Sequence, residues 1–263
     1  MERVAVTDYT LFYEVSDGNL VRYMQPIEIA VHRLGGDGPP LVLLHSLAGG
    51  TTTLSALASA LNSRYSVIGI DLRGFGASHR PTLEYAAATW ADDLSAILTE
   101  LAAGEEAVAF GHGVGACVAV EAVERGLVAA AGVSGIAFAP GQPAALDAVA
   151  LAGDAGEPVA AALAAVCSCE VVAGDLTGPV VARVIRAWQA YAGPAEPAAL
   201  NGKLLVFAGD GDTFTPPDAV GGAEALAAAT GAPLVALAAG HDLPRERPDE
   251  VAAALTRFLD DRR

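Results

Sequence analysis

Residues 111–115 form a glycine-rich turn, GHGVG, between an apolar run and a segment without helix breakers. Alternating glycines let the backbone bend sharply from a strand into a helix. The first turn of such a helix directs free N–H groups at a bound anion, so the turn suits a site where negative charge develops. Its middle residue, Gly113, has no side-chain oxygen, which excludes covalent catalysis at this position.

A dinucleotide-binding role for the same turn is less well supported. Glycine-rich turns bind pyrophosphate when they open a βαβ unit and an acidic residue follows ~20 residues later. Here the turn lies well into the chain, and no acidic residue follows a second strand at that distance. We therefore expect no nucleotide, and no other cofactor.

Five segments bearing glycine or polar residues occur in a recognisable order. They are LVLLHSLAGG (41–50), DLRGFGAS (71–78), GHGVGA (111–116), LLVFAGDGDTFTPP (204–217) and GHDLPRERP (240–248). Together they resemble the α/β-hydrolase superfamily from about residue 27 to the C-terminus. The first two segments are most similar to the enol-lactonase and small-esterase branch. The superfamily carries its nucleophilic serine in a G-x-S-x-G turn, and Gly113 stands in that serine's position.

The resemblance implies a catalytic acid and a catalytic histidine. The acid falls at Asp212, in the G-x-x-D pattern that begins at Gly209. Asp210 is the rival, although a solvated loop charge is its expected role. The histidine falls at His241, and the alternative is a surface loop histidine. The chain order of nucleophile position, acid and histidine is also that of the superfamily.

The resemblance further implies an oxyanion hole made by the backbone amides of Leu47 and Val114. Because both donors are backbone groups, the glycine at position 113 need not remove them. Ser46 stands where glycine is common in this loop; its hydroxyl either caps a turn or faces the pocket. We assign Ser46 and His112 as candidate substrate-binding residues, although His112 is expected to face sideways.

Other reactive residues have structural interpretations. Cys117 follows Gly113 by one helical turn and is expected to pack inside the core. Cys167 and Cys169 have no nearby histidine, so a metal site would have too few ligands, and we expect no bound metal. His45 ends an apolar run and is expected to be a hydrogen-bonded core histidine.

A histidine–aspartate dyad beside an oxyanion hole can still transfer protons. Asp212 would orient His241, and His241 would take a proton from the substrate, or from a water in the space left by the missing side chain. By resemblance, such chemistry includes lyases, cyclases, cofactor-free oxygenases and water-activating hydrolases, some of them in natural-product metabolism. The expected substrate is a small, fairly apolar molecule.

Two alternatives stay open. The chain could be an ester or lactone hydrolase whose serine has been replaced at position 113. It could instead be a non-catalytic binding protein on the same fold. The presence of both Asp212 and His241 favours the general-base enzyme.

Alternating apolar runs and helical segments predict an α/β fold with a mainly parallel sheet covered on both faces. The predicted helices include residues 116–125 and 249–259, and the second has an apolar stripe. Strands are predicted within residues 27–33, 41–45, 65–71, 107–110, 128–138, 203–208 and 234–237.

The domain prediction is an α/β-hydrolase core at 1–140 and 203–263, with a helical cap insert at 141–202. The insert is rich in alanine and contains no clear strand. We place it over the carboxyl ends of the strands, where open α/β sheets bind ligands. Residues 1–24 are either a strand pair at the sheet edge or an interface.

Composition limits the possible partners. A formal net charge of −16 argues against nucleic acid and anionic membranes. The most apolar stretch, residues 126–139, is shorter than the ~20 residues that span a bilayer. No signal peptide is visible, so we expect a cytoplasmic protein acting on a small molecule, with a homodimer possible.

Overall fold

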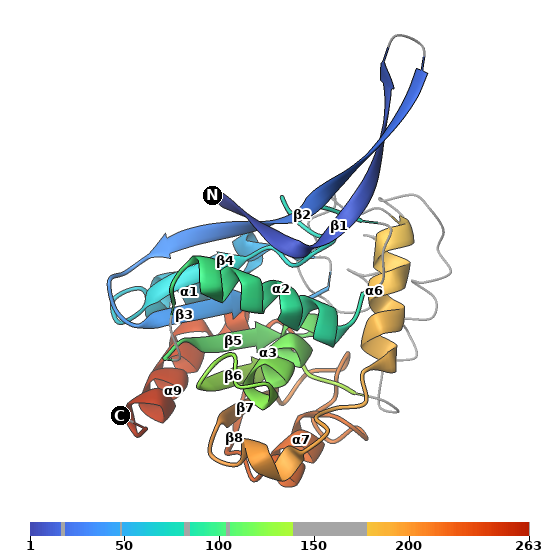
Figure 1. Ribbon diagram of the computed structural model, residues 1–263. Coiled ribbons are helices and arrows are strands. Elements are labelled where there is room, and N and C mark those ends of the chain that lie inside the picture. The colour runs from blue at the N-terminus through green and yellow to red at the C-terminus, as the bar shows by residue number, and fades with distance from the viewer. Residues whose placement is uncertain (17–18, 48, 82–84, 104–105, 139–177, 263) are drawn as a thin grey trace.

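The computed structural model describes residues 1–16, 19–47, 49–81, 85–103, 106–138 and 178–262. An eight-stranded sheet with the order β1-β2-β4-β3-β5-β6-β7-β8 forms its centre (Figure 1). The strands from β4 to β8 in this order pair in parallel, whereas β1 and β2 are antiparallel additions at one edge. The predicted mainly parallel α/β fold is confirmed.

Each predicted strand coincides with an observed one, within a few residues at its ends. The strands are β1 (Glu2–Ser16), β2 (Asn19–Gly35), β3 (Pro40–Leu44), β4 (Ser66–Ile70), β5 (Val108–His112), β6 (Ala130–Ser134), β7 (Leu204–Gly209) and β8 (Leu234–Leu237). Of the two interpretations of residues 1–24, the edge strand pair is the observed one, because β1 pairs with β2 from Glu2 to Ser16.

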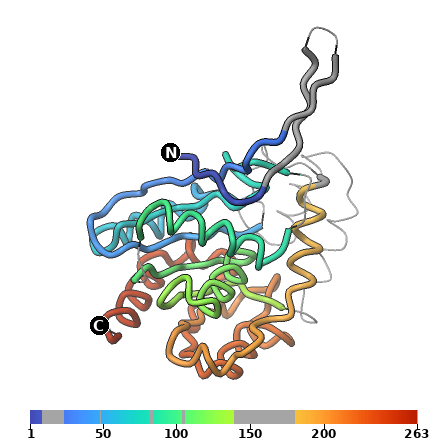
Figure 2. Tube along the Cα trace, viewed as in Figure 1, coloured from blue at the N-terminus to red at the C-terminus, as the bar shows by residue number. Residues whose placement is uncertain are grey.

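Helices cover both faces of the sheet. One face carries α2 (Ala87–Glu100), α3 (Val114–Glu124), η3 (Pro197–Leu200) and α7 (Ala223–Thr230). Buried residues of α6 (Gly178–Ala190) belong to the same hydrophobic cluster, and this helix lies beyond the ends of the strands (Figure 1). The other carries η1 (Thr51–Leu54), α1 (Ser55–Leu61), α8 (Leu243–Glu246) and α9 (Pro248–Asp260). The C-terminal α9, red in Figure 2, lies beside α1, and Arg64 after α1 donates hydrogen bonds of 2.9 and 2.7 Å to Asp260. Both predicted helices, 116–125 and 249–259, correspond to α3 and α9.

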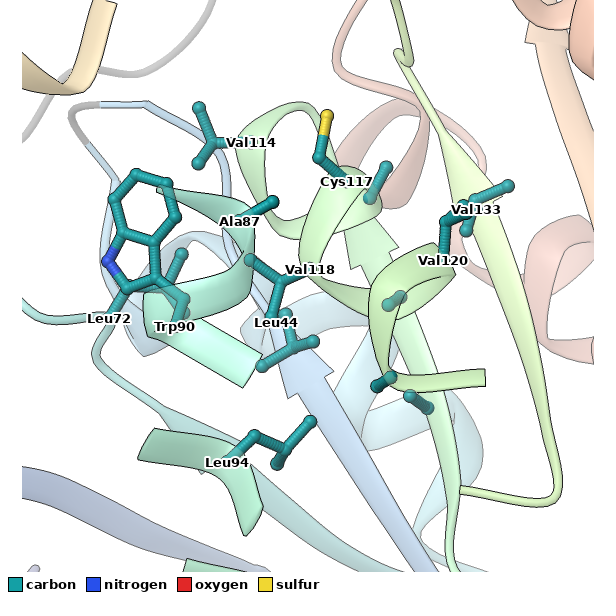
Figure 3. Packing of buried hydrophobic residues seen from close by; sticks show 14 of the residues in the cluster. Leu44, Leu72, Ala87, Trp90, Leu94, Val114, Cys117, Val118, Val120 and Val133 are labelled. Carbon is teal, nitrogen blue, oxygen red and sulfur yellow. The ribbon is translucent and has the colours of Figure 1, made fainter. Parts of the chain in front are cut away.

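The alternation of side chains along β3 divides the core in two. Val42 and Leu44 point into the larger cluster, whereas Leu41 and Leu43 point into the cluster under α1 and α9. In the larger cluster, Leu44 lies with Val118 of α3 and residues of α2 (Figure 3). Because β3 is buried on both faces, nearly all of its residues are apolar.

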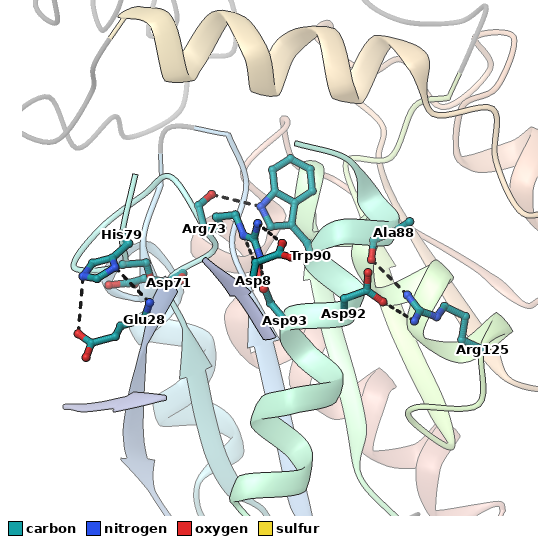
Figure 4. Close-up of polar contacts among 11 residues, drawn as sticks. Asp8, Glu28, Asp71, Arg73, His79, Ala88, Trp90, Asp92, Asp93 and Arg125 are labelled. Carbon is teal, nitrogen blue, oxygen red and sulfur yellow. Dashed lines mark hydrogen bonds and ion pairs between the residues drawn. The ribbon is translucent and has the colours of Figure 1, made fainter. Parts of the chain in front are cut away.

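A buried arginine joins the loop after β4 to α2. Arg73 is 1% exposed and donates two hydrogen bonds, of 2.9 and 2.5 Å, to the carboxylate of Asp93 (Figure 4). A third bond, of 2.8 Å, reaches Asp8 on β1. The indole of Trp90 donates to the Arg73 carbonyl oxygen at 3.2 Å. These contacts fix the loop that follows β4 against the helical layer.

The domain boundary prediction is only partly covered by the structure. Of the predicted cap at 141–202, the described part is α6 and the chain from 191 to 202, which includes η3. Residues 141–177, including Cys167 and Cys169, lie outside the described residues. The cap and its place over the strand ends therefore stay a prediction.

Gly115 allows α3 to approach β3 closely. A Cβ at this position would lie 2.2 Å from the carbonyl oxygen of Leu44 and 2.7 Å from that of His45. Because both atoms belong to the backbone, no side-chain rotation can relieve the contact. We expect Gly115→Ala to lower the free energy of unfolding by about 3 kcal/mol in urea denaturation.

Gly126 provides the control for that substitution. It has a φ of +70°, and a Cβ there would meet nothing within 4 Å. We expect Gly126→Ala to cost only about 1 kcal/mol, from the left-handed backbone. Equal losses in the two variants would contradict the close-approach explanation.

Candidate active site

The candidate site lies at the carboxyl ends of neighbouring parallel strands, where open α/β sheets bind ligands. Gly113 follows β5, Ser46 and Leu47 follow β3, Asp212 follows β7 and His241 follows β8. These residues come from distant parts of the sequence. The parallel strand order therefore brings the predicted residues to one edge of the sheet.

The turn at Gly113 has the strained backbone expected of a nucleophile elbow. Its φ of +57° and ψ of −118° lie in a region that L residues rarely adopt. Gly111 supports the turn, because a Cβ there would lie 2.2 Å from the Gly115 carbonyl oxygen. The elbow geometry is thus present without a nucleophile on it.

The predicted acid and histidine are hydrogen-bonded to each other. Nδ1 of His241 lies 2.9 Å from Oδ2 of Asp212, and both residues are buried. The other carboxylate oxygen accepts the amides of Phe214 and Thr215, at 2.9 and 2.8 Å. The rival Asp210 is exposed. The buried partner of the histidine is therefore Asp212.

Thr215 is a member of this network that sequence analysis missed. Its hydroxyl donates to Oδ2 of Asp212 at 2.6 Å and lies 3.1 Å from Nδ1 of His241. The signal was a threonine three residues after the aspartate, a spacing at which hydroxyl and amide groups often bond a carboxylate. Thr215 thus limits the rotation of the carboxylate that orients the histidine.

Hydrogen bonding keeps the Asp212 carboxyl group ionised. Burial would raise its pKa, but the His241 ring and the Thr215 hydroxyl and amide together lower it below its usual value. An ionised carboxylate only accepts hydrogen bonds, so Nδ1 of His241 carries the proton and donates it. In this tautomer the lone pair lies on Nε2.

Nε2 of His241 has no hydrogen-bond partner among the described residues, although it is buried. The ring is held from two sides, edge-on by Phe214 and tilted against His112, each with a centroid separation of 4.8 Å. A buried acceptor without a partner is costly and needs an explanation. Here the free atom is the one that a general base uses.

His112 faces its neighbouring strand, as expected. Its Nδ1 lies 3.0 Å from the Ser134 hydroxyl on β6. Burial, and then the proximity of the His241 ring, lowers its pKa to about 3. His112 therefore stays neutral at physiological pH beside His241, while its predicted role in substrate binding stays a prediction.

This low pKa predicts a pH-dependent stability. As the pH falls below 6.5, the ordinary value for histidine, the unfolded chain binds a proton that the folded His112 does not. Stability is therefore lost on acidification, by about 2 kcal/mol for this group between pH 6.5 and 5. We expect His112→Gln to lose about 2 kcal/mol less unfolding free energy than the native protein between pH 6.5 and 5. Urea denaturation at several pH values measures this difference. Parallel curves for the two proteins would contradict this.

The two predicted oxyanion amides are not used by the turns around them. Gly113 donates its amide to the Ser134 carbonyl oxygen at 2.9 Å, and Gly115 donates to that of His45 at 3.1 Å. Val114, between them, is the first residue of α3, where an amide has no intrahelical acceptor. The turn and loop hydrogen bonds of the described residues do not include the Leu47 amide either. Neither donor therefore has a backbone acceptor among the residues that the structure describes, and their role as an oxyanion hole stays a prediction.

The position of Ser46 bears on two expectations: that its hydroxyl could cap a turn, and that the space beside Gly113 is empty. The turn after β3 is closed by its carbonyl oxygen, which accepts the Gly49 amide at 3.1 Å, and not by its hydroxyl. The space beside Gly113 is also not vacant, because the Ser46 hydroxyl lies 2.0 Å from where a Cβ of residue 113 would stand. This contact cannot be predicted from the sequence, because it depends on the pairing of β3 with β5.

Buried groups hold the loop that carries Ser46. Nδ1 of His45 donates to the Ser46 carbonyl oxygen at 2.7 Å, and its Nε2 accepts the Leu72 amide at 2.9 Å. Burial lowers the pKa of His45, in keeping with a neutral ring that donates on one side and accepts on the other. The expected core role of His45 is confirmed.

Cys117 also has the expected structural position. It is buried among core residues (Figure 3), and burial raises the pKa of its thiol. A protonated thiol in the core is a poor nucleophile. Cys117 is therefore no substitute for the missing serine.

Two large cavities lie away from the dyad. One, of about 700 Å³, lies against α2, α3 and α6 and is lined by residues such as Tyr85, Glu121 and Arg183. The other, of about 760 Å³, is lined by residues such as Tyr65 and Arg262. Neither is lined by His241, so neither volume bears on the size of a substrate at the dyad.

The described part of the chain offers neither a membrane span nor a metal site. Its helices include none with the length and apolar character needed to cross a membrane. Its His, Cys, Asp and Glu side chains form no group of three or more that could hold a metal ion.

A parallel sheet with a glycine elbow after β5 and a hydrogen-bonded Asp–His pair after β7 and β8 defines an α/β-hydrolase architecture. The model of the alpha/beta hydrolase family matches residues 41–254. The chain therefore belongs to the alpha/beta hydrolase family.

Known proteins are similar over different lengths. A 90-residue segment, 34% of this chain, is 32% identical to 2-(acetamidomethylene)succinate hydrolase of Mesorhizobium japonicum and spans 32% of that protein. A thermophilic esterase from Thermogutta terrifontis has a TM-score of 0.76, with 22% identity over 99% of both chains. The enol-lactonase of Burkholderia xenovorans LB400 has a TM-score of 0.69, with 22% identity over 94% of this chain and 99% of that one. At such identities, the two structures establish the fold alone.

Proposed function

We propose that this protein is an enzyme in which His241, oriented by Asp212, acts as a general base on a small, fairly apolar organic molecule. The observation that carries the proposal is the buried Nε2 of His241, which has no partner among the described residues while Nδ1 bonds Asp212 at 2.9 Å. General bases need this asymmetry, with one ring nitrogen held and the other free for the substrate.

The amides of Leu47 and Val114 support a reaction in which negative charge develops on oxygen. An enolate, an alkoxide or a tetrahedral intermediate would each be stabilised by two such donors. Lyase, cyclase, cofactor-free oxygenase and water-activating hydrolase reactions all satisfy this requirement. The relative named for hydrolysis of a succinate derivative favours a substrate with a carbonyl group.

The alternative of a hydrolase with its serine replaced at position 113 is less well supported. A Cβ there would lie 2.0 Å from Oγ and 2.9 Å from Cβ of Ser46. Rotation of the Ser46 side chain could move its hydroxyl but not its Cβ. With Ser46 in this position, the structure leaves room for a glycine at position 113 but not for a side chain.

A substrate panel tests the proposal. The panel contains an activated short-chain ester, an enol lactone, an aromatic cyanohydrin and an oxygen-sensitive enolisable heteroaromatic compound. We expect the native protein to convert at least one class, His241→Ala to convert none, and the control His79→Gln to behave as the native protein does. Conversion that survives His241→Ala would exclude the proposed base. Tight binding of a panel compound without conversion would favour a non-catalytic binding protein.

A further inference from the structure

Ser46 occupies the place of the side chain that Gly113 lacks. An ideal Cβ on Gly113 would lie 2.0 Å from Oγ, 2.9 Å from Cβ and 3.4 Å from Cα of Ser46. The first two of these distances are shorter than the separation of non-bonded heavy atoms in proteins. The loop after β3 therefore brings a hydroxyl into the space that an elbow side chain would fill.

The backbone around Ser46 is fixed, whereas its hydroxyl is not committed to the turn. The carbonyl oxygen of Ser46 accepts both the Gly49 amide and the His45 ring, at 3.1 and 2.7 Å. The residue as a whole is half-buried, and its hydroxyl lies against the turn at Gly113. A hydroxyl on a fixed backbone is a suitable arrangement for a reactive group.

The other parts of a nucleophilic site are carried by loops at the same edge of the sheet. His241 is held by Asp212 and has Nε2 free among the described residues. The Val114 amide starts α3 directly after Gly113, and the Leu47 amide directly follows Ser46. In unliganded enzymes the bond between nucleophile and base is often long and forms only with substrate. A candidate base, two candidate amides and a hydroxyl thus follow β8, β5 and β3 at the carboxyl ends of the parallel strands.

We propose that Ser46 is the nucleophile of this site and that its substrates are carboxylic esters or lactones. This inference rests on the proposed function, because it needs His241 as the base. Oγ of Ser46 attacks the carbonyl carbon while its proton passes to Nε2 of His241. The bond to the leaving oxygen then breaks, and His241 returns the proton to that oxygen. Water, deprotonated by His241, cleaves the acyl–Ser46 ester, releases the acid and restores the hydroxyl.

Covalent labelling tests this assignment directly. The native protein is incubated with an alkyl fluorophosphonate, which a nucleophilic serine attacks with loss of fluoride. Intact-mass measurement and peptide mapping then locate the adduct. We expect one adduct, on Ser46, which is absent in Ser46→Ala and forms at least ~100-fold more slowly in His241→Ala. The matched control is Ser59→Ala, at an exposed serine on α1, which should label as the native protein does.

A double variant separates failure of this inference from failure of the proposed function. Ser46→Gly combined with Gly113→Ser removes the steric conflict and returns a hydroxyl to the elbow, and its thermal melting verifies folding. If the double variant is labelled at position 113 while the native protein is unlabelled, Ser46 is not the nucleophile and the proposed base stands. If the folded double variant and the native protein both resist labelling, Ser46 is not the nucleophile, and the loss or survival of substrate conversion in His241→Ala then decides separately whether the proposed base stands.

Discussion

Replacing His241 by alanine is expected to lower kcat by about 10³-fold or more on whichever substrate the native protein converts. The variant loses the only ring whose Nε2 is buried without a partner among the described residues.

Asp212→Asn should lower kcat by a comparable ~10²–10⁴-fold, because an amide does not enforce the tautomer in which Nε2 is the acceptor. Thr215→Val should cost only ~10-fold, since it removes one of several bonds to the carboxylate. Steady-state kinetics with purified variants measures all three.

Asp210→Asn is the matched control for Asp212→Asn. Asp210 is only two residues away but exposed, and it is not the carboxylate bonded to His241. Its substitution should leave kcat within about twofold of the native value. A larger loss in Asp210→Asn than in Asp212→Asn would reverse the assignment of the acid.

Removing the Asp93 carboxylate is expected to give the largest loss of stability from a single polar residue. Asp93→Ala leaves the Arg73 guanidinium, 1% exposed, with Asp8 as its one remaining ion-pair partner within the described part of the chain (Figure 4). A buried charge that loses its main partner costs about 3–5 kcal/mol. We expect the midpoint of urea unfolding to fall accordingly, with an unchanged m-value.

Asp8→Ala removes the other bond to Arg73 and serves as the control. The Asp8 side chain is 52% exposed, so water screens its interaction with Arg73. Its loss should cost at most about 1 kcal/mol. Similar losses in the two variants would show that burial does not determine the strength of these ion pairs.

Strands in the middle of the sheet were predictable because apolar burial on both faces gives an uninterrupted apolar run. The segment at 41–45 is such a run, and it forms β3 with both faces buried. The first 24 residues were ambiguous, because their aromatic residues suit either an edge strand pair or an interface. Pairing of β1 with β2 resolves the ambiguity, and that pairing depends on contacts between segments.

The candidate acid and histidine were identified through the resemblance of their loops to a known family, not through any local physical pattern. The structure brings Asp212 and His241 into hydrogen-bonding contact, and their catalytic role stays a prediction. Thr215 was missed, because its contribution depends on the direction of its hydroxyl toward Asp212.

The sequence by itself determined the successive strands from residue 27 onward, the apolar core and the absence of a side chain at Gly113, because these follow from residue type and periodicity. Only the tertiary structure decided what replaces that side chain. Ser46 approaches Gly113 because β3 pairs with β5 and because Gly115 lets α3 pack against the end of β3. A contact between two strand ends depends on the pairing of strands and the close packing of backbones, which no local stretch of sequence specifies.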